Sequence, residues 1–430
     1  MFIENFIERN IFEIKNQGIP VVIRKIFTLT KTFFLIPIYL ISLPILVFIH
    51  LISPWYLIRF QDIVSSRIGH FSINTELYCC EIDFKINLPK QKYLDLFYYK
   101  DISNKQLAIM WKRKLNVLPN WLLSPIHNIN KFFVNFLPTL KIHSIGRNTC
   151  NDRDVLNLID KCKTHLEFTN EEKVLGKEIL KKFGLSEKDK FVCLTIYDSS
   201  YLNTYHPYSA WNYHKTRSFD VNNFMLAAEE IAKRGYYVFR MGKIVSKPFQ
   251  SNNPKIIDYS NSDLKSDFMD IYLAAKCSLC ISGSSGFESV TQVFRKPLVQ
   301  IVVPLLDAKT WSGNVLVLTK HYYSNKKQKM LSLSEILTSS IANCIDFKKI
   351  EAQGIKLMDN SPDEIKDIAL EAIDRLEGKW KSMQIDKELQ DKFWKIYYSS
   401  DLINSYRFRH KELKAKFSSK FLRKNPDWVN

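Results

Sequence analysis

Hydrophobic positions along this chain follow two periods that alternate. Short apolar runs rich in aromatic and β-branched residues predict strands. Segments with an apolar residue every three or four positions predict helices between them. The expected strands are 55–60, 94–99, 190–196, 236–241, 255–259, 278–282 and 297–303. The expected helices are 70–82, 104–115, 170–184, 221–234, 267–276, 287–294 and 361–378. This alternation predicts an α/β fold, with a parallel sheet covered by helices on both faces.

Local signals fix several helix ends. Gly184 and Gly235 follow apolar-periodic segments and are expected to stop them. Segment 361–378 begins with Ser361 as cap, Pro362 at the first helical position and Glu364 completing a capping box. The remaining tail is basic and aromatic. It is expected to form a helical extension that covers the sheet or is solvated, with a membrane-facing surface as the alternative.

Composition shifts divide the chain into four parts. Residues 1–54 are expected to form an amphipathic and hydrophobic membrane-association segment. Residues 55–188 and 189–360 each carry strand–helix alternation, which predicts two Rossmann-like domains, and residues 361–430 form the C-terminal extension.

The N-terminal part contains a long uncharged stretch, residues 33–53. A bilayer span takes about 20 residues, but Pro37 and Pro44 interrupt this stretch. Basic residues on both sides give it no clear orientation. We therefore expect a monotopic or re-entrant anchor, with a true span or a buried core helix as alternatives. Residues 1–30 alternate apolar with charged positions, which is typical of an interfacial helix.

The charge balance points to an anionic partner. The chain has 62 Lys and Arg against 44 Asp and Glu, a net charge of +18. A membrane surface, nucleic acid or a phosphorylated substrate would fit that excess. Because the basic residues are spread along the chain and match no nucleic-acid module, we expect an anionic membrane surface and no nucleic acid. The Cys277–Cys280 pair falls beside a strand with no second pair at zinc spacing, so buried thiols are expected there.

The sequence CISGSSGFESV, residues 280–290, joins a strand to a helix through small residues. Free amides at a helix start bind anions, and glycines let the ligand approach the backbone. Ligands of open α/β sheets bind at the carboxyl ends of strands, where three more loops are expected. The candidate diphosphate-binding residues are Arg240, Gly242, Lys243, Ser282, Gly283, Ser284, Ser285, Gly286 and Glu288. Asp198 and Tyr201, after the strand at 190–196, are candidate substrate-binding residues.

Simpler interpretations exist for several of these residues. Glu288 could accept hydrogen bonds from ribose hydroxyls, or it could only complement the positive end of its helix. Arg240 could offset phosphate charge or form an ion pair. The turn is neither a dinucleotide fingerprint nor a Walker loop. Asp152 and Asp154 form a literal DxD, but they precede a predicted helix, where aspartates act as caps; no metal site is expected.

The expected N-terminal α/β domain offers a second set of polar residues. Arg67, Gly69 and His70 follow its first strand, and His70 is the candidate catalytic base because imidazole titrates near neutral pH. An orienting or structural histidine is the alternative. His206, His214 and Arg217 lie in a long loop that is expected to close over substrate.

These segments resemble a family of poorly characterised bacterial glycosyltransferases from surface-polysaccharide gene clusters. The resemblance rests on RIGHFSINTELY, IYDSSYL, YHKTR, YYVFRMGKIVSKPF, PKIIDYSNSDLKSDFMDIYLAAKC, ISGSSGFESV and FRKPLV, from about Ile58 to Pro304. It implies a GT-B-like pair of domains facing across a cleft. The C-terminal domain would hold a nucleotide-sugar co-substrate and the N-terminal domain a glycan or lipid-linked acceptor.

The resemblance also implies roles for residues. The turn and Arg240 would take the diphosphate, Glu288 the ribose and His70 the acceptor proton, with no bound metal and no cofactor. The tripeptide motifs of better-studied GT-B enzymes are not evident here, so these roles rest on position. The expected location is the cytoplasmic face of the inner membrane. Alternatives are a nucleotide-sugar epimerase or pyruvyl transferase on the same fold, or a non-catalytic membrane- or anion-binding protein.

Overall fold

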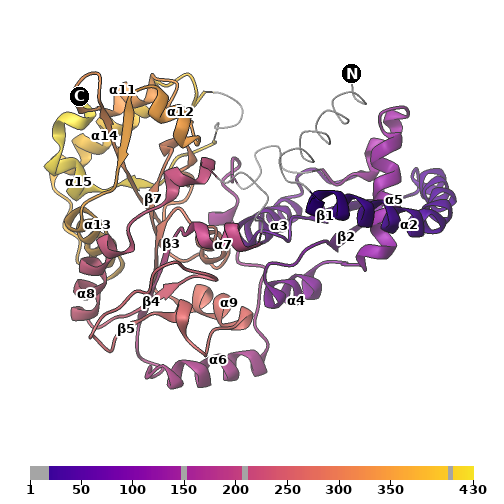
Figure 1. Cartoon of the computed structure of the whole chain (residues 1–430), viewed down its shortest axis with the longest axis horizontal. Coiled ribbons are helices and arrows are strands. Elements are labelled where there is room, and N and C mark those ends of the chain that lie inside the picture. The colour runs from indigo at the N-terminus through magenta and orange to yellow at the C-terminus, as the bar shows by residue number, and fades with distance from the viewer. Residues whose placement is uncertain (1–18, 147–152, 206–211, 405–409) are drawn as a thin grey trace. The chain divides into compact units, whose positions relative to one another are not determined.

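The protein is described by a computed structural model that covers residues 19–146, 153–205, 212–404 and 410–430 (Figure 1). The chain separates into two compact units that interleave along the sequence. Unit 1 comprises residues 1–63, 89–100 and 115–146, and unit 2 comprises residues 64–88, 101–114 and 147–430. His206, Asp152 and the first 18 residues lie outside the described residues.

Unit 2 is built on a seven-stranded sheet with the order β12-β8-β7-β6-β3-β4-β5, in which all neighbouring strands are parallel. Its central strands are buried apolar runs, as expected for strands covered on both faces. The strands are β3 (Phe191–Ile196), β4 (Tyr237–Met241), β5 (Ile256–Ile257), β6 (Leu279–Gly283), β7 (Leu298–Val302), β8 (Val315–Thr319) and β12 (Lys416–Phe417). The predicted α/β class with a large parallel sheet is confirmed.

Helices cover both faces of this sheet. α8 and α13 pack together, and α13 contacts β6, β7 and β8, while α10 packs on β6 and β7 and is itself contacted by α3 and α9 (Figure 1). The helices of unit 2 are α3 (Ile68–Asp83), α4 (Lys105–Lys114), α6 (Asn170–Lys182), α7 (Ser199–Tyr205), α8 (Met225–Lys233), α9 (Asp267–Lys276), α10 (Phe287–Val293), α11 (Leu333–Leu337), α12 (Phe347–Ala352), α13 (Pro362–Leu376), α14 (Gln384–Tyr398) and α15 (Ser419–Lys424).

A smaller antiparallel sheet completes unit 2, with the order β10-β9-β11. Its strands are β9 (His321–Ser324), β10 (Lys329–Met330) and β11 (Ile355–Met358). They enclose an apolar cluster that includes Val303, Tyr322 and Ile355, with Trp428 packed against it. The basic and aromatic tail therefore packs on the domain, and β12 adds to the sheet edge at β8.

Unit 1 has one parallel strand pair in its described residues, β1 (Tyr56–Ile63) with β2 (Lys92–Tyr99). Two helices belong to it, α2 (Ile19–Ile52) and α5 (Asn120–Phe133), and both contact the strands. Its core joins Leu46 and Ile49 of α2 to Phe60, Tyr98, Leu123 and Ile126. Nowhere in the part of the chain described here is a helix both long and apolar enough to cross a bilayer.

A buried ion pair fixes the register of the two strands of unit 1. Arg59 lies opposite Asp95 in the pairing, and its Nε and Nη2 donate to the two carboxylate oxygens at 2.7 and 2.6 Å. Both side chains are less than a tenth exposed. Any other register would leave two buried charges unpaired, which is strongly unfavourable.

We expect Arg59→Met to destabilise unit 1 by about 3–5 kcal/mol, because it leaves the Asp95 carboxylate buried without its partner. The double variant Arg59→Met with Asp95→Leu removes both charges and should stay close to wild type. Hydrogen exchange of the β1 and β2 amides gives the free energy of opening. Equal exchange in the single variant and the wild type would contradict the role of the pair.

Candidate functional site

The strand order of unit 2 reverses between β3 and β6. From β3 the chain adds β4 and β5 on one side, and then crosses to place β6, β7 and β8 on the other. Open parallel sheets bind ligands outside the carboxyl ends of strands at such a reversal. Ile196 and Gly283, the last residues of β3 and β6, are paired there. The serine–glycine turn therefore begins at the position where the sheet itself favours a ligand.

Hydroxyl groups hold the turn in shape. Ser282 Oγ accepts from the Ser285 amide at 3.2 Å, and Ser284 Oγ donates to the Ile301 carbonyl at 2.8 Å. Ser284 adopts a positive φ of 56°, which an ordinary residue tolerates only when its surroundings hold it. Ser285 Oγ lies 3.4 Å from the Phe287 amide. The serines thus shape the backbone.

The turn is buried at its base and open at its tip. Ser282 and Ser284 are buried, Ser285 is half-buried and Gly286 is exposed. Below the turn, Gly283 packs against the rings of Phe219 and Phe224. Among the described residues, no acceptor lies within hydrogen-bond reach of the Ser284 and Gly286 amides.

The start of α3 lies against the tip of this turn. A Cβ placed on Gly69 would lie 3.1 Å from the Gly286 carbonyl oxygen and 3.2 Å from its Cα. Both contacts are with backbone, which cannot move aside as a side chain can. Only glycine lets α3 approach so closely. The predicted residues Arg67, Gly69 and His70 are thereby brought beside the predicted turn, within unit 2.

Two helix starts therefore meet at Gly69 and Gly286. Within the described structure, neither N-cap residue, Arg67 of α3 or Gly286 of α10, caps its helix with a side chain, and Ser285 Oγ makes only a long contact with the first amide of α10. The unsatisfied amides of a helix start carry partial positive charge. Two such ends side by side repel each other weakly, and an anion bound beside both of them relieves the repulsion. The arrangement suits a diphosphate chemically.

Glu288 follows the turn on α10 and is buried, with only 6% of its surface exposed. Its Oε1 accepts from Gln300 Nε2 at 2.8 Å and lies 3.7 Å from Lys309 Nζ. Its Oε2 is buried and has no hydrogen-bond partner among the described residues. One turn further on, the Gln292 amide group also has no partner in the part of the chain that the structure describes. Such groups are costly unless a ligand or water completes them.

Arg240 and Lys243, predicted to bind phosphate, are engaged by the protein. Arg240 is buried at the end of β4, where it donates to Ser260 and lies 3.6 Å from Asp258. Burial lowers its pKa, and Asp258 partly offsets that effect. Lys243 donates to Asp267 at 2.8 Å. Gly242 lies between them, and a Cβ there would meet Val245. Their phosphate-binding roles remain predictions.

Asp198 caps the turn into α7. Its oxygens accept from the Ser200 amide at 2.9 Å and from the Ser246 amide at 2.7 Å. Burial alone raises its pKa, but these hydrogen bonds outweigh burial and lower the pKa overall. Tyr201 lies half-buried on α7. The contacts of Asp198 describe a structural cap and leave its predicted substrate role untested.

The described residues of the long loop after α7 make several contacts, and one of them involves a predicted site residue. Arg217 Nη2 lies 3.5 Å from Asp307, which also accepts from Arg153 at 2.7 Å. His214 belongs to a short 3-10 helix, η3 (Asn212–Arg217). The acid of the DxD that is described, Asp154, accepts from the Leu158 and Ile159 amides at 2.8 Å. The helix predicted after it is wrong, because this segment forms a single 3-10 turn, η2 (Ile159–Lys161), and Asp154 therefore closes a loop and does not cap a helix.

Sequence reasoning missed a buried ion-pair network beneath α3. Glu76 is fully buried and accepts from Arg295 at 2.6 Å and from His165 Nδ1 at 3.0 Å. The other ring nitrogen of His165 lies 2.9 Å from Asp83. Burial lowers the pKa of His165, but the two carboxylates outweigh burial and raise the pKa overall. The network joins α3 to His165 and Arg295, which lie in two distant segments of the chain, so no local pattern could reveal it.

The same network has a geometry that a metal ion could use. Ligand atoms of Glu76, Cys80 and His165 lie within 4.8 Å of one another. However, the Arg295 guanidinium already donates a hydrogen bond to the Glu76 carboxylate, and it lies 3.9 Å from Cys80 Sγ. A cation would have to displace that guanidinium. We therefore interpret the cluster as ion pairing that attaches α3 and α10 to the segment around His165.

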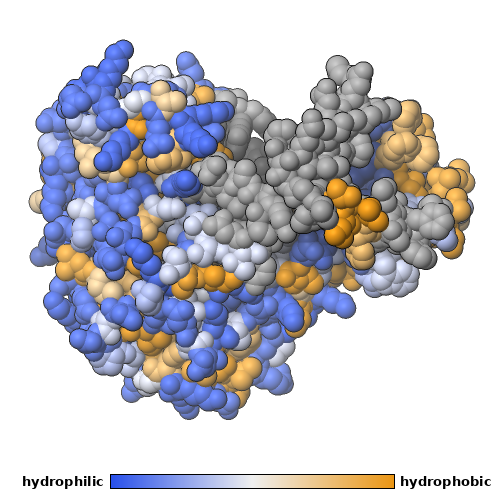
Figure 2. Space-filling model, in the orientation of Figure 1, coloured by the Kyte–Doolittle hydropathy of each residue, from blue (hydrophilic) through white to orange (hydrophobic). Residues whose placement is uncertain are grey.

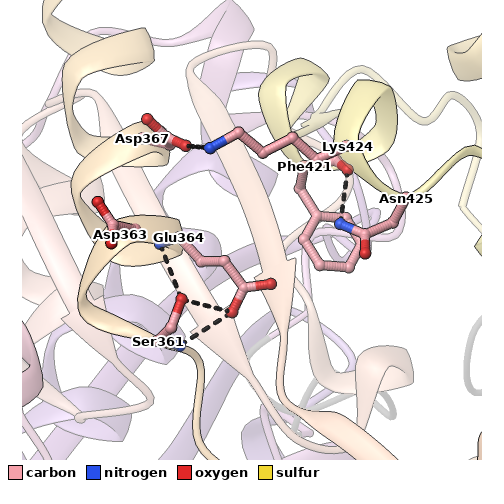
Figure 3. A pocket seen from close by; sticks show the side chains of 7 residues that line it. All are labelled: Ser361, Asp363, Glu364, Asp367, Phe421, Lys424 and Asn425. Atoms are coloured by element: carbon pink, nitrogen blue, oxygen red, sulfur yellow. Dashed lines mark hydrogen bonds and ion pairs between the residues drawn. The ribbon is translucent and has the colours of Figure 1, made fainter.

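A surface pocket of about 240 Å³ lies elsewhere in unit 2, between α13 and α15 (Figure 3). Its acidic groups already have partners. Glu364 completes a capping box with Ser361 and also bonds His321, and Asp367 accepts from Lys424. The lining residues are Ser361, Asp363, Glu364, Asp367, Phe421, Lys424 and Asn425. None of them belongs to the predicted site.

No family model matches the chain, and no curated protein matches it. Several solved structures show a weak likeness to this chain. A glycosyl transferase family 9 protein from Veillonella parvula is 12% identical over 61% of this chain and 85% of its own, with a TM-score of 0.35. The ADP-heptose lipopolysaccharide heptosyltransferase II of E. coli is 12% identical over 61% of this chain and 90% of its own, with a TM-score of 0.34.

The third structure is a protein from Listeria monocytogenes assigned as a UDP-N-acetylglucosamine 2-epimerase. It is 10% identical over 75% of this chain and 89% of its own, with a TM-score of 0.29. At TM-scores and identities this low, a shared fold is not established. Fold and site therefore stand on the sheet order and contacts of this chain alone.

Gly69→Ala should destabilise unit 2 by about 1–3 kcal/mol, because the added methyl meets the Gly286 backbone. Gly313→Ala is the matched control, since a Cβ there has only the Lys414 side chain near it, at 3.8 Å. Thermal unfolding of both variants compares the two sites. A Gly69→Ala protein as stable as the control would show that the helix starts are not in tight contact.

The His165 network should make stability depend on pH. Because folding raises the pKa of His165, its ion pairs stabilise the fold fully below the unfolded value of about 6.5. That contribution fades as pH rises through the folded value. His165→Gln should therefore cost more stability at pH 6 than at pH 9 in urea unfolding. The same loss at both pH values would contradict a charged His165.

Proposed function

We propose that this chain is a glycosyltransferase that moves a sugar from a nucleotide-diphosphate donor to a glycan or lipid-linked glycan acceptor. The observation that carries the proposal is the serine–glycine turn at the sheet reversal, with its exposed Gly286 against the start of α3. Such a site suits a diphosphate, which is the leaving group of a nucleotide sugar. The GT-B-like pairing of two Rossmann-like domains across a cleft belongs to this proposal.

The donor would bind through the backbone of the turn. The amides near Gly286 and the first turn of α3 would donate to the phosphate oxygens, and Arg67 would add positive charge at the α3 start. Glu288 would bind the ribose, because Oε2 has no partner while Gln300 holds Oε1 in place. The amides and Arg67 would stabilise the negative charge that develops on the diphosphate as the sugar leaves.

His70 would act as the base in this reaction. It would take the proton from an acceptor hydroxyl, whose oxygen forms a bond to the anomeric carbon of the sugar. The bond from that carbon to the diphosphate breaks, and the nucleoside diphosphate leaves with the electron pair. The position of His70, next to Gly69 in the first turn of α3, supports this role.

The reaction is proposed to need no bound metal and no cofactor, since the helix starts supply the positive charge. An anionic membrane surface and a location at the cytoplasmic face of the inner membrane are part of the proposal. The net charge of +18 and the apolar N-terminal segment support both.

Gly286→Ala tests donor binding without disturbing the fold. Its Cβ would meet nothing closer than 3.5 Å, yet it would cover the exposed end of the turn. We expect nucleoside diphosphate affinity, measured by calorimetry, to fall at least about tenfold, the scale of one charge-assisted hydrogen bond. Gly313→Ala should bind like wild type. Unchanged affinity of the Gly286→Ala variant for the nucleoside diphosphate would show that the turn does not bind the donor.

Product analysis separates the proposed activity from its alternatives. Incubation with donor and acceptor should release nucleoside diphosphate and lengthen the glycan, whereas an epimerase would change the donor without acceptor. Binding without any turnover would indicate an anion-binding protein.

A further inference from the structure

From Pro37 to Ile52, helix α2 carries no charged residue on any side, and among its described side chains the protein buries one stripe. Ser42, Leu46 and Ile49 are at most 8% exposed, and the last two join the core of unit 1. The other apolar side chains face outward. Leu40, Ile41, Val47, Phe48 and Leu51 are between 51% and 68% exposed. A helix apolar on all sides requires a surrounding that is not water.

Helix α5 and the segment after it extend the same apolar surface. α5 packs on α2, and Asn128 donates to the Tyr39 hydroxyl at 3.2 Å. At its end Phe132 contacts Phe133 and Phe136, with ring centroids 5.2 and 5.5 Å apart. Phe132 is 61% and Phe136 is 72% exposed. We call α2, α5 and residues 134–137 the apolar face; Figure 2 shows hydrophobic residues gathered over both helices.

The charge around the apolar face has one sign. The described part of unit 1 contains two carboxylates, Asp62 and Asp95, and both are buried and form ion pairs. The exposed charged side chains there are basic. They include Lys90, Lys92, Lys100, Lys131 and Lys141.

We propose that the apolar face docks on an anionic lipid bilayer, with Phe132, Phe133 and Phe136 inserted as an aromatic wedge. Apolar and aromatic side chains bordered by lysines are what an anionic membrane interface selects. A second copy of the chain fits less well, because pairing two such faces would bring lysines together, and the described residues of unit 1 offer no exposed carboxylate to compensate. This inference rests on the membrane part of the proposed function and not on the sugar-transfer reaction, and it assigns to α5 a role that the N-terminal segment alone does not provide.

Vesicle flotation of the full chain tests the proposal. Vesicles of phosphatidylglycerol and phosphatidylcholine should bind wild type, whereas vesicles of phosphatidylcholine alone should bind it at least about tenfold less. The triple variant Phe132→Ser, Phe133→Ser, Phe136→Ser should lose at least about tenfold in partitioning. The matched control is Val174→Ser with Leu175→Ser on α6, two exposed apolar residues of unit 2, and it should partition like wild type.

Hydrogen exchange with and without vesicles supplies a second readout. Lipid should protect residues 129–137 in wild type and leave α6 unchanged. The proposal is overturned if the triple variant floats like wild type, or if the control loses as much binding. It is also overturned if both vesicle types bind equally, or if light scattering without lipid shows a dimer that the triple variant abolishes.

Discussion

The close contact of Gly69 with Gly286 is the constraint on which the candidate site depends. It is possible only because Gly69 lacks a side chain, and it joins the start of α3 to the turn that ends β6. The sheet order places that turn at the reversal between β3 and β6. Two uncapped helix starts are thereby held together, which gives the site a positive potential from backbone alone.

The ion-pair network of Glu76, His165 and Arg295 stabilises the arrangement of the two helices that make this contact. Arg295 follows α10 and Glu76 lies on α3, so their ion pair ties together the two helices whose starts meet. Because the pair is buried, losing one partner would leave an unpaired charge, and the helices would no longer be held in place. The same physical logic appears in unit 1, where Arg59 and Asp95 fix the strand register. In both units, buried ion pairs set positions that apolar packing leaves free.

Patterns within single segments predicted much of the fold, because helix caps and apolar runs each lie within one segment of the sequence. The capping box at Ser361, the apolar runs of β3, β6 and β7, and the helix at 267–276 all appear where the sequence places them. Contacts between distant residues could not be predicted in this way. β12 pairs with β8 across about a hundred residues, and Arg240 turns inward to Ser260 and Asp258. The segments around Gly69 and Gly286 were each predicted to bind a ligand, but their contact was not predicted, because neither segment carries a signal that identifies the other as its neighbour.

A crystal structure of the full chain with a bound nucleoside diphosphate tests the central claim most directly. The account expects the two phosphates beside Gly286, within hydrogen-bond reach of amides from the turn and from the first turn of α3. The Glu288 carboxylate should then face the ribose. A nucleotide bound in another part of the chain, with the helix starts at Gly69 and Gly286 unoccupied, would contradict the account.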